Sequence, residues 1–242
     1  MKLSVVVPVR NEAENVESLI LEIHQVLSSL EVYEMVFVDD GSTDQTFSNL
    51  KRLMTTYPSL RVLQHQRSYG QSRAIHSGVR AAQFHWIVTL DGDGQNDPAD
   101  IPKLLEVLHQ HQPELLWMLS GFRYQRHDSY WRKFTSWFAN SVRQSVLHDQ
   151  TPDTGCGLKL FQRDKFLNLP YFDHMHRFLP ALMQICGGQV VSVKVNHRQR
   201  QFGVSKYGTF DRLMVGIIDI LGVMWLKKRQ NPAIITEVQR GD

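Results

Sequence analysis

Apolar runs and amphipathic segments alternate along the first half of this chain. Short runs of apolar and β-branched residues predict buried strands, and such runs lie at residues 3–7 (which Pro8 ends), 35–38, 61–64, 86–90 and 115–119. Apolar residues three or four positions apart predict helices at residues 12–30, 72–83 and 98–111. A further helix is expected after the second strand, with Ser42 or Thr43 as its cap. This alternation indicates an α/β fold with a mostly parallel central sheet flanked by helices.

Two segments of the second half combine apolar residues with charges. Residues 131–146 carry aromatic and aliphatic side chains on one helical face, which is typical of a core helix. Because the basic loop 121–133 precedes these residues, a helix that lies on a membrane surface remains the alternative interpretation. Residues 210–226 are strongly apolar, but three charged residues leave stretches shorter than the ~20 residues that span a bilayer. We expect a C-terminal amphipathic helix that packs or lies at an interface.

Length and composition fit one soluble domain. A chain of 242 residues can bury one large α/β core, and 42% apolar and 21% charged residues are ordinary for globular proteins. The start has no cationic and apolar leader. The two cysteines, Cys156 and Cys186, are too few for a disulfide framework and lack the spacing of metal ligands. These features predict a cytoplasmic protein.

The net charge is only +3, but the charges are unevenly distributed. Nine acids fall between Glu12 and Asp44, whereas residues 193–207 carry four basic residues and no acid, and residues 123–133 hold a second basic cluster. Both clusters are short and no nucleic-acid-binding motif accompanies them, so we expect no nucleic acid and favour phosphate on a smaller ligand. Solvated basic loops remain the alternative for either cluster alone.

The most informative motif follows the predicted strand at 86–90, where Asp91 and Asp93 stand one residue apart. Ligands bind beyond the carboxyl ends of strands in open α/β sheets, so both carboxylates are expected at the cleft. Neighbouring carboxylates repel unless a cation joins them, and few oxygen ligands suit Mg²⁺ or Mn²⁺ completed by water and substrate phosphates. A calcium loop of the EF-hand type is excluded, because its glycine and glutamate positions hold Asn96 and Pro102.

Acids also follow the first two predicted strands. The first turn, residues 8–12, contains no glycine, so the G-x-G-x-x-G dinucleotide fingerprint is absent and a nicotinamide enzyme is disfavoured. Glu12, Asp39 and Asp40 instead suit ribose hydroxyls and base N–H groups. A turn followed by a helix cap is the alternative for residues 39–42.

Three blocks, each at a predicted strand end, make a specific signature: residues 5–12 (VVVPVRNE), 38–44 (VDDGSTD) and 91–95 (DGDGQ), the last followed by Pro98. With them the chain resembles an inverting glycosyltransferase of family two, whose single-domain nucleotide-sugar-binding fold is called GT-A. It looks most like the polyprenyl-phosphate sugar transferases, which include the dolichol-phosphate mannosyltransferases and the bacterial undecaprenyl-phosphate glycosyltransferases. The stretches that carry this closer resemblance are residues 153–159, 176–180 and 197–207.

The chain departs from that group in two ways. Gly92 stands where alanine is usual, and the paired C-terminal transmembrane helices of many bacterial members are missing. The resemblance, which covers residues 3–226, therefore implies membrane attachment that is peripheral or through a partner.

The resemblance implies a GT-A domain over residues 1–226, with a nucleotide-sugar half at about 1–120 and an acceptor half at about 121–226. A basic and polar tail follows at 227–242. The implied donor is a UDP- or GDP-linked sugar, whose diphosphate is bridged by Mg²⁺ or Mn²⁺. The metal ligands carried over from the family are Asp91, Asp93 and Gln95, and the nucleotide-pocket residues are Pro8, Val9, Glu12, Asp39, Asp40, Gly92, Arg200 and Lys206.

The implied acceptor is a polyprenyl phosphate of the undecaprenyl or dolichyl type. A phosphate monoester with a second pKa of about 6 is largely a dianion at neutral pH and needs no general base. Catalysis then needs cations that hold two anionic reactants in line for attack on the anomeric carbon, with inversion. We expect Arg200 and Lys206 to contact the donor diphosphate. Arg123 and Arg126, with Ser205 beside them, are expected to contact the acceptor phosphate. These four cations form the expected catalytic set together with Asp91 and Asp93. The reverse assignment stays open.

Two other functions stay open. A glycan or small-molecule hydroxyl acceptor would need a carboxylate base, for which Asp153 is the candidate. A non-catalytic nucleotide-sugar-binding partner of a membrane protein would keep the fold and lose transfer. Cys156 is expected to be structural rather than a nucleophile, whereas the role of His197 stays open. We expect a peripheral protein on the cytoplasmic face of the membrane, and a separate transmembrane partner and a homodimer are both open.

Overall fold

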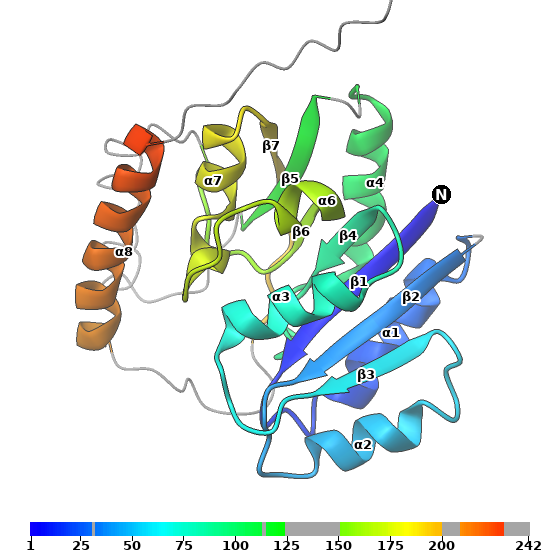
Figure 1. Cartoon of the computed structure of the whole chain (residues 1–242). Helices are drawn as coiled ribbons and strands as arrows, with labels where there is room; N and C mark the ends of the chain where they lie inside the picture. Colours follow the sequence, from blue (N-terminus) through cyan, green and yellow to red (C-terminus); the bar gives the residue numbers. More distant parts are fainter. Residues whose placement is uncertain (31, 113–114, 124–150, 200–208, 230–242) are drawn as a thin grey trace, which may run out of the picture.

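The computed structural model of the protein describes residues 1–30, 32–112, 115–123, 151–199 and 209–229. They form an α/β domain around a seven-stranded sheet of order β3-β2-β1-β4-β6-β5-β7 (Figure 1). The strands are β1 (Lys2–Val9), β2 (Val32–Asp39), β3 (Leu60–Gln64), β4 (Trp86–Thr89), β5 (Leu116–Arg123), β6 (Lys159–Gln162) and β7 (Gln189–Val195). β6 runs antiparallel to β4 and β5, and the other pairs are parallel, which confirms the predicted sheet.

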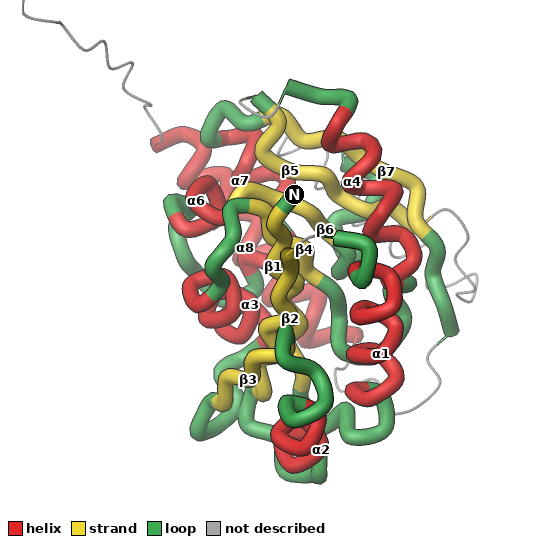
Figure 2. The backbone as a smooth tube through the Cα atoms, turned by 90° about the vertical axis from the view of Figure 1, so that its right-hand side faces the viewer, coloured by secondary structure: helices red, strands yellow, loops and turns green. Residues whose placement is uncertain are grey.

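Helices cover both faces of the sheet (Figure 2). They are α1 (Val16–Leu27), α2 (Thr46–Leu53), α3 (Gln71–Ala81), α4 (Ile101–His109), α6 (Arg163–Leu167), α7 (Leu179–Ile185) and α8 (Thr209–Arg229), with the 3-10 helices η1 (Pro98–Asp100) and η2 (Met175–Arg177). α1, α2 and α4 pack with Val5 and Val7 on one face, and α3, α6 and α7 pack with Val6 on the other. Successive strand residues point to opposite faces, so the apolar run of β1 serves both cores.

β1 continues through Pro8 to Val9, so the prediction that Pro8 ends this strand is wrong. Pairing with β4 stops at Val6, whose carbonyl accepts from Leu90 N, whereas pairing with β2 continues to Val9. The main-chain polar groups of successive strand residues point alternately to the two neighbouring strands, so those of Pro8, like those of Val6, point to the β4 side. Pro8 lies beyond the residues of β1 that pair with β4. No ladder hydrogen bond is lost there, and a proline fits inside a central strand.

α1 begins at Val16, four residues later than predicted. Asn11 has a φ of 51°, in the left-handed region that asparagine enters more readily than most residues. Glu12 O then accepts from Asn15 N and Val16 N in a turn that precedes the helix. The loop after β1 therefore carries Glu12 at the carboxyl edge of the sheet.

α2 begins at Thr46, so the prediction that Ser42 or Thr43 caps this helix is wrong. Ser42 Oγ instead accepts from Asn11 N at 2.9 Å, and Thr43 N donates to Asn11 Oδ1 at 2.8 Å. These hydrogen bonds tie the loop after β1 to the loop after β2.

The sequence pattern missed β6 and β7 and ended β5 too early. β5 runs to Arg123, because β7 pairs with it up to Arg123 opposite Val195. The first three residues of the predicted basic loop 121–133 therefore lie in a strand. The rest of that loop and the predicted helix 131–146 lie outside the described residues.

α8 confirms the predicted C-terminal helix and extends it to Arg229, so the predicted tail at 227–242 begins inside the helix. Val223 is fully buried, and Ile220, Met224 and Leu226 pack against the core on the α7 side. Within the part of the chain that the structure describes, no helix has the length and apolar character needed to cross a membrane.

Candidate active site

The loop after β4 carries Asp91 and Asp93 at the carboxyl edge of the parallel strands. Asn96 is 3% exposed and holds this loop from inside, because its Oδ1 accepts from Asp91 N at 2.9 Å. Asp93 Oδ1 accepts from Gln95 N at 3.1 Å, and Gly94 between them has a φ of 72°. The two carboxylates therefore stand on one defined turn, which we call the DGD loop (residues 91–96).

The turn before β6 packs closely against the DGD loop at Gly157. A β-carbon at this position would lie 2.3 Å from Asp91 Cγ and 2.6 Å from Asn96 Oδ1. Thr89 Oγ1 donates to Gly157 O at 2.8 Å and fixes the turn to β4. Only glycine leaves room for the Asp91 carboxylate here.

Asp91 is only partly accessible, and its carboxylate lies among buried polar groups. Burial raises the pKa of Asp91, and the charge of Asp93 raises it further, from 3.8 to about 6. The charges of Lys159 and Arg123 act in the opposite direction, as does Gln71, whose Nε2 donates to Asp91 Oδ1 at 2.8 Å. A cation between the two carboxylates would relieve their repulsion.

The residues present fit a hard divalent cation. Asp91 and Asp93 offer carboxylate oxygens one residue apart, and the described residues contain no group of three or more His, Cys, Asp or Glu side chains that could enclose a metal. Mg²⁺ is usually held by one or two carboxylates, with water and substrate phosphates completing its coordination. The DGD loop matches that pattern, because it offers two carboxylates on one turn.

Arg123 and Asp153 form a buried ion pair next to this loop. Arg123 Nε and Nη2 donate to the two Asp153 oxygens at 2.6 and 2.9 Å, and the side chains are 19% and 7% exposed. The main-chain N–H groups of Arg123 and Gly155 also donate to Asp153, at 3.3 and 3.2 Å. Burial opposes the charge of Arg123, but the hydrogen bonds and charge of Asp153 outweigh it and raise the pKa of Arg123.

Lys159 in β6 adds a second buried cation. Its side chain donates to Cys156 O, and burial lowers its pKa against the charges of Asp91 and Asp153. Burial also raises the pKa of the Cys156 thiol. A buried neutral thiol is a poor nucleophile, which agrees with the structural role expected for Cys156.

The end of β2 places Asp39, its last residue, and Asp40 at the same edge, but both side chains are buried. Asp39 Oδ1 accepts from Ser42 N at 3.1 Å, and Asp39 Oδ2 accepts from Gln64 at 3.4 Å.

Asp40 binds the loop that leads into α3, through His65 Nδ1 at 2.7 Å, Ser68 Oγ at 2.7 Å, Tyr69 N at 2.9 Å and Gly70 N at 2.9 Å. Burial opposes ionisation of Asp40, but these hydrogen bonds outweigh it and hold its pKa below the ordinary value. Asp40 thus positions the segment that ends in Gln71.

The remaining predicted pocket residues lie in or next to β1. Pro8 and Val9 are buried. A β-carbon on Gly92 would lie 2.5 Å from Val9 Cγ1 and 2.9 Å from Pro8 O, so glycine lets the DGD loop pack on β1. Glu12 N donates to Thr46 Oγ1 at 2.8 Å, and Glu12 Oε2 accepts from Asn15 at 2.7 Å. These residues line the edge of the sheet that carries Asp91.

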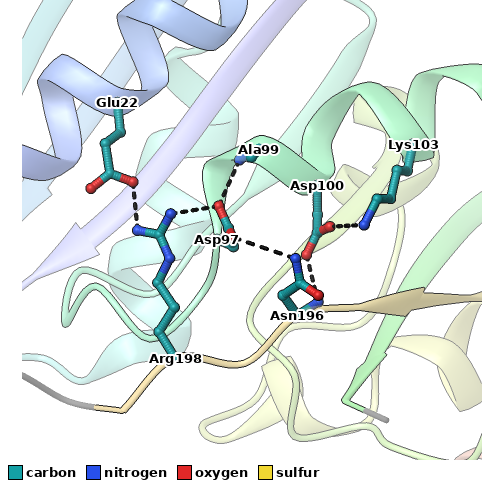
Figure 3. A network of polar contacts seen from close by, with 7 residues as sticks. All are labelled: Glu22, Asp97, Ala99, Asp100, Lys103, Asn196 and Arg198. Carbon is teal, nitrogen blue, oxygen red and sulfur yellow. Dashed lines mark hydrogen bonds and ion pairs between the residues drawn. The ribbon is translucent and has the colours of Figure 1, made fainter. Parts of the chain in front are cut away.

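Polar contacts join the segment after β7 to Asp97 and Asp100 of the turn into α4, directly after the DGD loop (Figure 3). Arg198 pairs with Glu22 at 2.6 Å and with Asp97 at 2.7 Å, so two carboxylates already neutralise this basic residue. Arg198 N also donates to Gln95 O at 3.0 Å. His197 forms an isolated antiparallel bridge with Asn96. His197 and Arg198 of the predicted basic segment therefore lie against the DGD loop.

The other predicted cations and the predicted acceptor hydroxyl lie outside the described residues: Arg126, Arg200, Ser205 and Lys206. Sequence reasoning missed Gln71, Gly157 and Lys159 as part of the site. Gln71 gave no signal, because it belongs to no motif. Gly157 was visible in a Gly-x-Gly turn, and Lys159 stood out as a single cation between leucines.

Residues 4–169 match the family model described as glycosyl transferase family 2. The chain is 34% identical over 233 residues to dodecaprenyl-phosphate galacturonate synthase of Rhizobium johnstonii, an alignment that covers 94% of this chain and 68% of the relative.

Two solved structures share the fold. Glucosyl-3-phosphoglycerate synthase of Mycobacterium tuberculosis, in complex with Mn²⁺, UDP and glucosyl-3-phosphoglycerate, has a TM-score of 0.69 at 18% identity over 93% of this chain and 79% of its own. A mannosyltransferase of Pyrobaculum calidifontis, in complex with GDP-Man and Mn²⁺, has a TM-score of 0.65 at 22% identity over 96% of this chain and 65% of its own.

Proposed function

The chain belongs to glycosyl transferase family 2, and we propose that it transfers a sugar from a nucleotide-diphosphate sugar to a polyprenyl phosphate, with inversion at the anomeric carbon. It is a glycosyltransferase of the polyprenyl-phosphate sugar synthase type, as is its relative that makes dodecaprenyl-phosphate galacturonate. The same relative supports the donor and acceptor classes, and both UDP- and GDP-linked sugars suit the site.

The state of Asp153 is the single observation that favours a phosphate acceptor over a hydroxyl acceptor. A hydroxyl must lose its proton during attack and needs a positioned base. Asp153, the candidate for that base, already accepts from two guanidinium nitrogens and two main-chain N–H groups. A carboxylate engaged in this way holds Arg123 in place and is poorly placed to take a proton. A phosphate dianion needs no base, and Arg123 is a cation suited to binding it.

Metal binding in this proposal falls to Asp91 and Asp93, with Gln95 beside them. Bound Mg²⁺ or Mn²⁺ would act as a Lewis acid that neutralises the departing diphosphate. Gly157 packs against the Asp91 carboxylate, and Asn96 Oδ1 holds the Asp91 main chain by accepting from its N–H. The protein thus supplies orientation and charge, which suffice for in-line attack by an anionic oxygen.

Arg200 and Lys206 are proposed to contact the donor diphosphate, and Arg126 and Ser205 to join Arg123 at the acceptor phosphate. Arg198 N is bonded to Gln95 O in the DGD loop. Arg200 follows two residues later in the sequence. This connection favours the donor for Arg200, although it leaves the reverse assignment of the basic clusters to be tested.

The nucleotide-sugar half is proposed to comprise about residues 1–120, with the nucleotide bound along Pro8, Val9, Glu12, Asp39, Asp40 and Gly92. The acceptor half comprises about residues 121–226. Because the acceptor is a membrane lipid, we place the protein peripherally on the cytoplasmic face of the membrane, by direct contact or with a transmembrane partner.

A transfer assay tests this function. Purified protein is incubated with Mg²⁺ or Mn²⁺, undecaprenyl or dolichyl phosphate and a panel of radiolabelled UDP- and GDP-sugars, and label is counted in the organic extract. We expect metal-dependent label with one donor, lost in Asp93→Ala and kept in Asp164→Ala, whose carboxylate side chain is 70% exposed on α6. Nucleotide-sugar binding without label in lipid would instead favour a hydroxyl acceptor or a non-catalytic partner.

A further inference from the structure

We propose that the outer face of α8 docks on a lipid bilayer that contains anionic phospholipid, with the helix lying in the plane of the headgroups. The proposal rests on the proposed function in one respect, because a lipid acceptor requires the site to approach a membrane. The docking face itself follows from the burial and charge of α8.

One face of α8 is apolar and exposed. Ile217, Ile218, Leu221 and Trp225 are 48%, 66%, 58% and 60% exposed. At about 100° per residue these four side chains fall within an arc of about 100°, and the fully buried Val223 points the opposite way. The helix is therefore attached to the domain along one side and presents an apolar strip on the other. An amphipathic helix of this kind buries its strip at the boundary of headgroups and acyl chains.

Basic residues flank the strip at the C-terminal end of the helix. The last turn carries Lys227, Lys228 and Arg229, all exposed. By the same rotation, Lys228 falls within the apolar arc and Arg229 falls about 20° beyond its edge. The one acid among residues 216–229, Asp219, lies on the attached side and contacts His174 Nδ1 at 3.3 Å. The exposed face thus carries positive charge next to apolar surface, which complements an anionic bilayer.

α8 is linked to the metal site by three successive contacts. Gln71, the first residue of α3, donates to Asp91 at 2.8 Å. The next residue, Ser72, contacts His176 Nδ1 at 2.7 Å in η2, and His174 just before η2 contacts Asp219 of α8. Docking α8 on a bilayer would therefore hold the DGD loop close to the surface where a polyprenyl phosphate exposes its headgroup.

A second copy of the chain is a poorer occupant for this face. The strip from Ile217 to Trp225 is about 12 Å long and, at a helix diameter of about 10 Å, covers an area on the order of 120 Å². A stable protein interface buries roughly 800 Å² per partner, which is much more. A bilayer has no such minimum, since each inserted side chain contributes separately.

The test compares vesicle binding of three variants. Ile218→Ser with Leu221→Ser and Trp225→Ser removes the strip, and Lys228→Glu with Arg229→Glu reverses the flanking charge. The control, Leu21→Ser with Met54→Ser, removes two apolar side chains that are each 42% exposed outside α8. Flotation with vesicles of phosphatidylethanolamine and phosphatidylglycerol, or of phosphatidylcholine alone, reports binding, and light scattering reports the oligomeric state.

We expect the wild type and the control to float with the anionic vesicles, and much less with phosphatidylcholine. Loss of the strip should weaken binding by about tenfold or more per side chain removed, and charge reversal should weaken it by about tenfold or more. Unchanged flotation of the strip variant, or a dimer that the strip variant abolishes, would overturn the proposal.

Transfer to a short, water-soluble prenyl phosphate separates this proposal from the proposed function. Docking alone predicts that the strip variant keeps this soluble transfer while it loses transfer to polyprenyl phosphate in vesicles. A wild type that floats but transfers to neither acceptor would contradict the function and leave the docking face supported.

Discussion

Arg123 donates through both Nε and Nη2 to the carboxylate of Asp153, at 2.6 and 2.9 Å. The pair joins the end of β5 to the turn that precedes β6, and both side chains are largely buried. Asp153 is therefore the partner that orients the arginine, rather than a base that waits for a substrate proton.

Breaking this pair should cost stability. Asp153→Asn leaves a buried guanidinium without its counter-ion, and we expect the free energy of unfolding to fall by about 3 kcal/mol. Glu17→Gln is the matched control, because it breaks the ion pair between Arg52 and Glu17, whose side chains are 59% and 60% exposed, respectively. This exposed pair should contribute less than about 1 kcal/mol to the free energy of unfolding. Urea unfolding measures both, and equal effects would show that the pair is not a buried anchor.

In the absence of bound metal, the ionised Asp91 carboxylate should destabilise the folded protein. The pKa of Asp91 is raised from 3.8 to about 6 by burial and by Asp93, so the folded state binds more protons between these values. Stability should fall as the pH rises through this window, because ionised Asp91 is then buried beside a like charge. Asp91→Asn should thus raise the melting temperature in EDTA at pH 8, have little effect at pH 4, and abolish transfer.

Calorimetry at the two pH values checks this prediction. Asp164→Asn, an exposed carboxylate on α6, serves as the control and should leave the melting temperature unchanged at both. A stabilisation of Asp91→Asn that is equal at pH 4 and pH 8 would contradict the assigned cause.

Proton competition should also govern metal binding. Mn²⁺ must displace any proton on Asp91, so its apparent affinity should be constant above about pH 7 and fall about tenfold per unit below the pKa of about 6. Electron paramagnetic resonance of free Mn²⁺ measures the affinity. An affinity that is flat down to pH 5 would exclude Asp91 as a ligand.

Gly157→Ala should impair metal binding although neither proposed ligand, Asp91 or Asp93, is substituted. The new β-carbon would lie 2.3 Å from Asp91 Cγ and push the carboxylate out of place. We expect Mn²⁺ affinity and transfer to fall by about 10- to 100-fold, as for other groups that orient a metal ligand. Gly216→Ala, where a β-carbon meets nothing within 4 Å, is the control and should bind Mn²⁺ normally.

Much of the first half of the fold follows from local pattern. β1, β2, β3 and β4 are apolar runs, and the acids at the ends of β1, β2 and β4 mark the carboxyl edge of the sheet, so Asp91 and Asp93 could be placed there from sequence alone. The errors in this half come from tertiary hydrogen bonds. Ser42 bonds to the neighbouring loop instead of capping α2, and Pro8 is tolerated because its β4 side is unpaired.

The acceptor side was harder to predict, because its signals are not periodic. β6 has four residues, KLFQ, and runs directly out of a glycine-rich turn. Its Lys159 faces a buried polar cluster that only the antiparallel pairing with β4 and β5 brings together. Likewise, the basic character of Arg123 was visible, but its partner Asp153 lies 30 residues away in sequence.

The most direct test of the account is a comparison of two acceptors that differ in one group. With the productive sugar nucleotide and Mn²⁺, the protein is offered either a polyprenyl phosphate or the corresponding free polyprenol, and sugar in the lipid extract is counted. The account predicts transfer to the phosphate and none to the alcohol, because Arg123 is a cation and Asp153, the candidate base, is already engaged with it. Transfer to the alcohol at a comparable rate would contradict it.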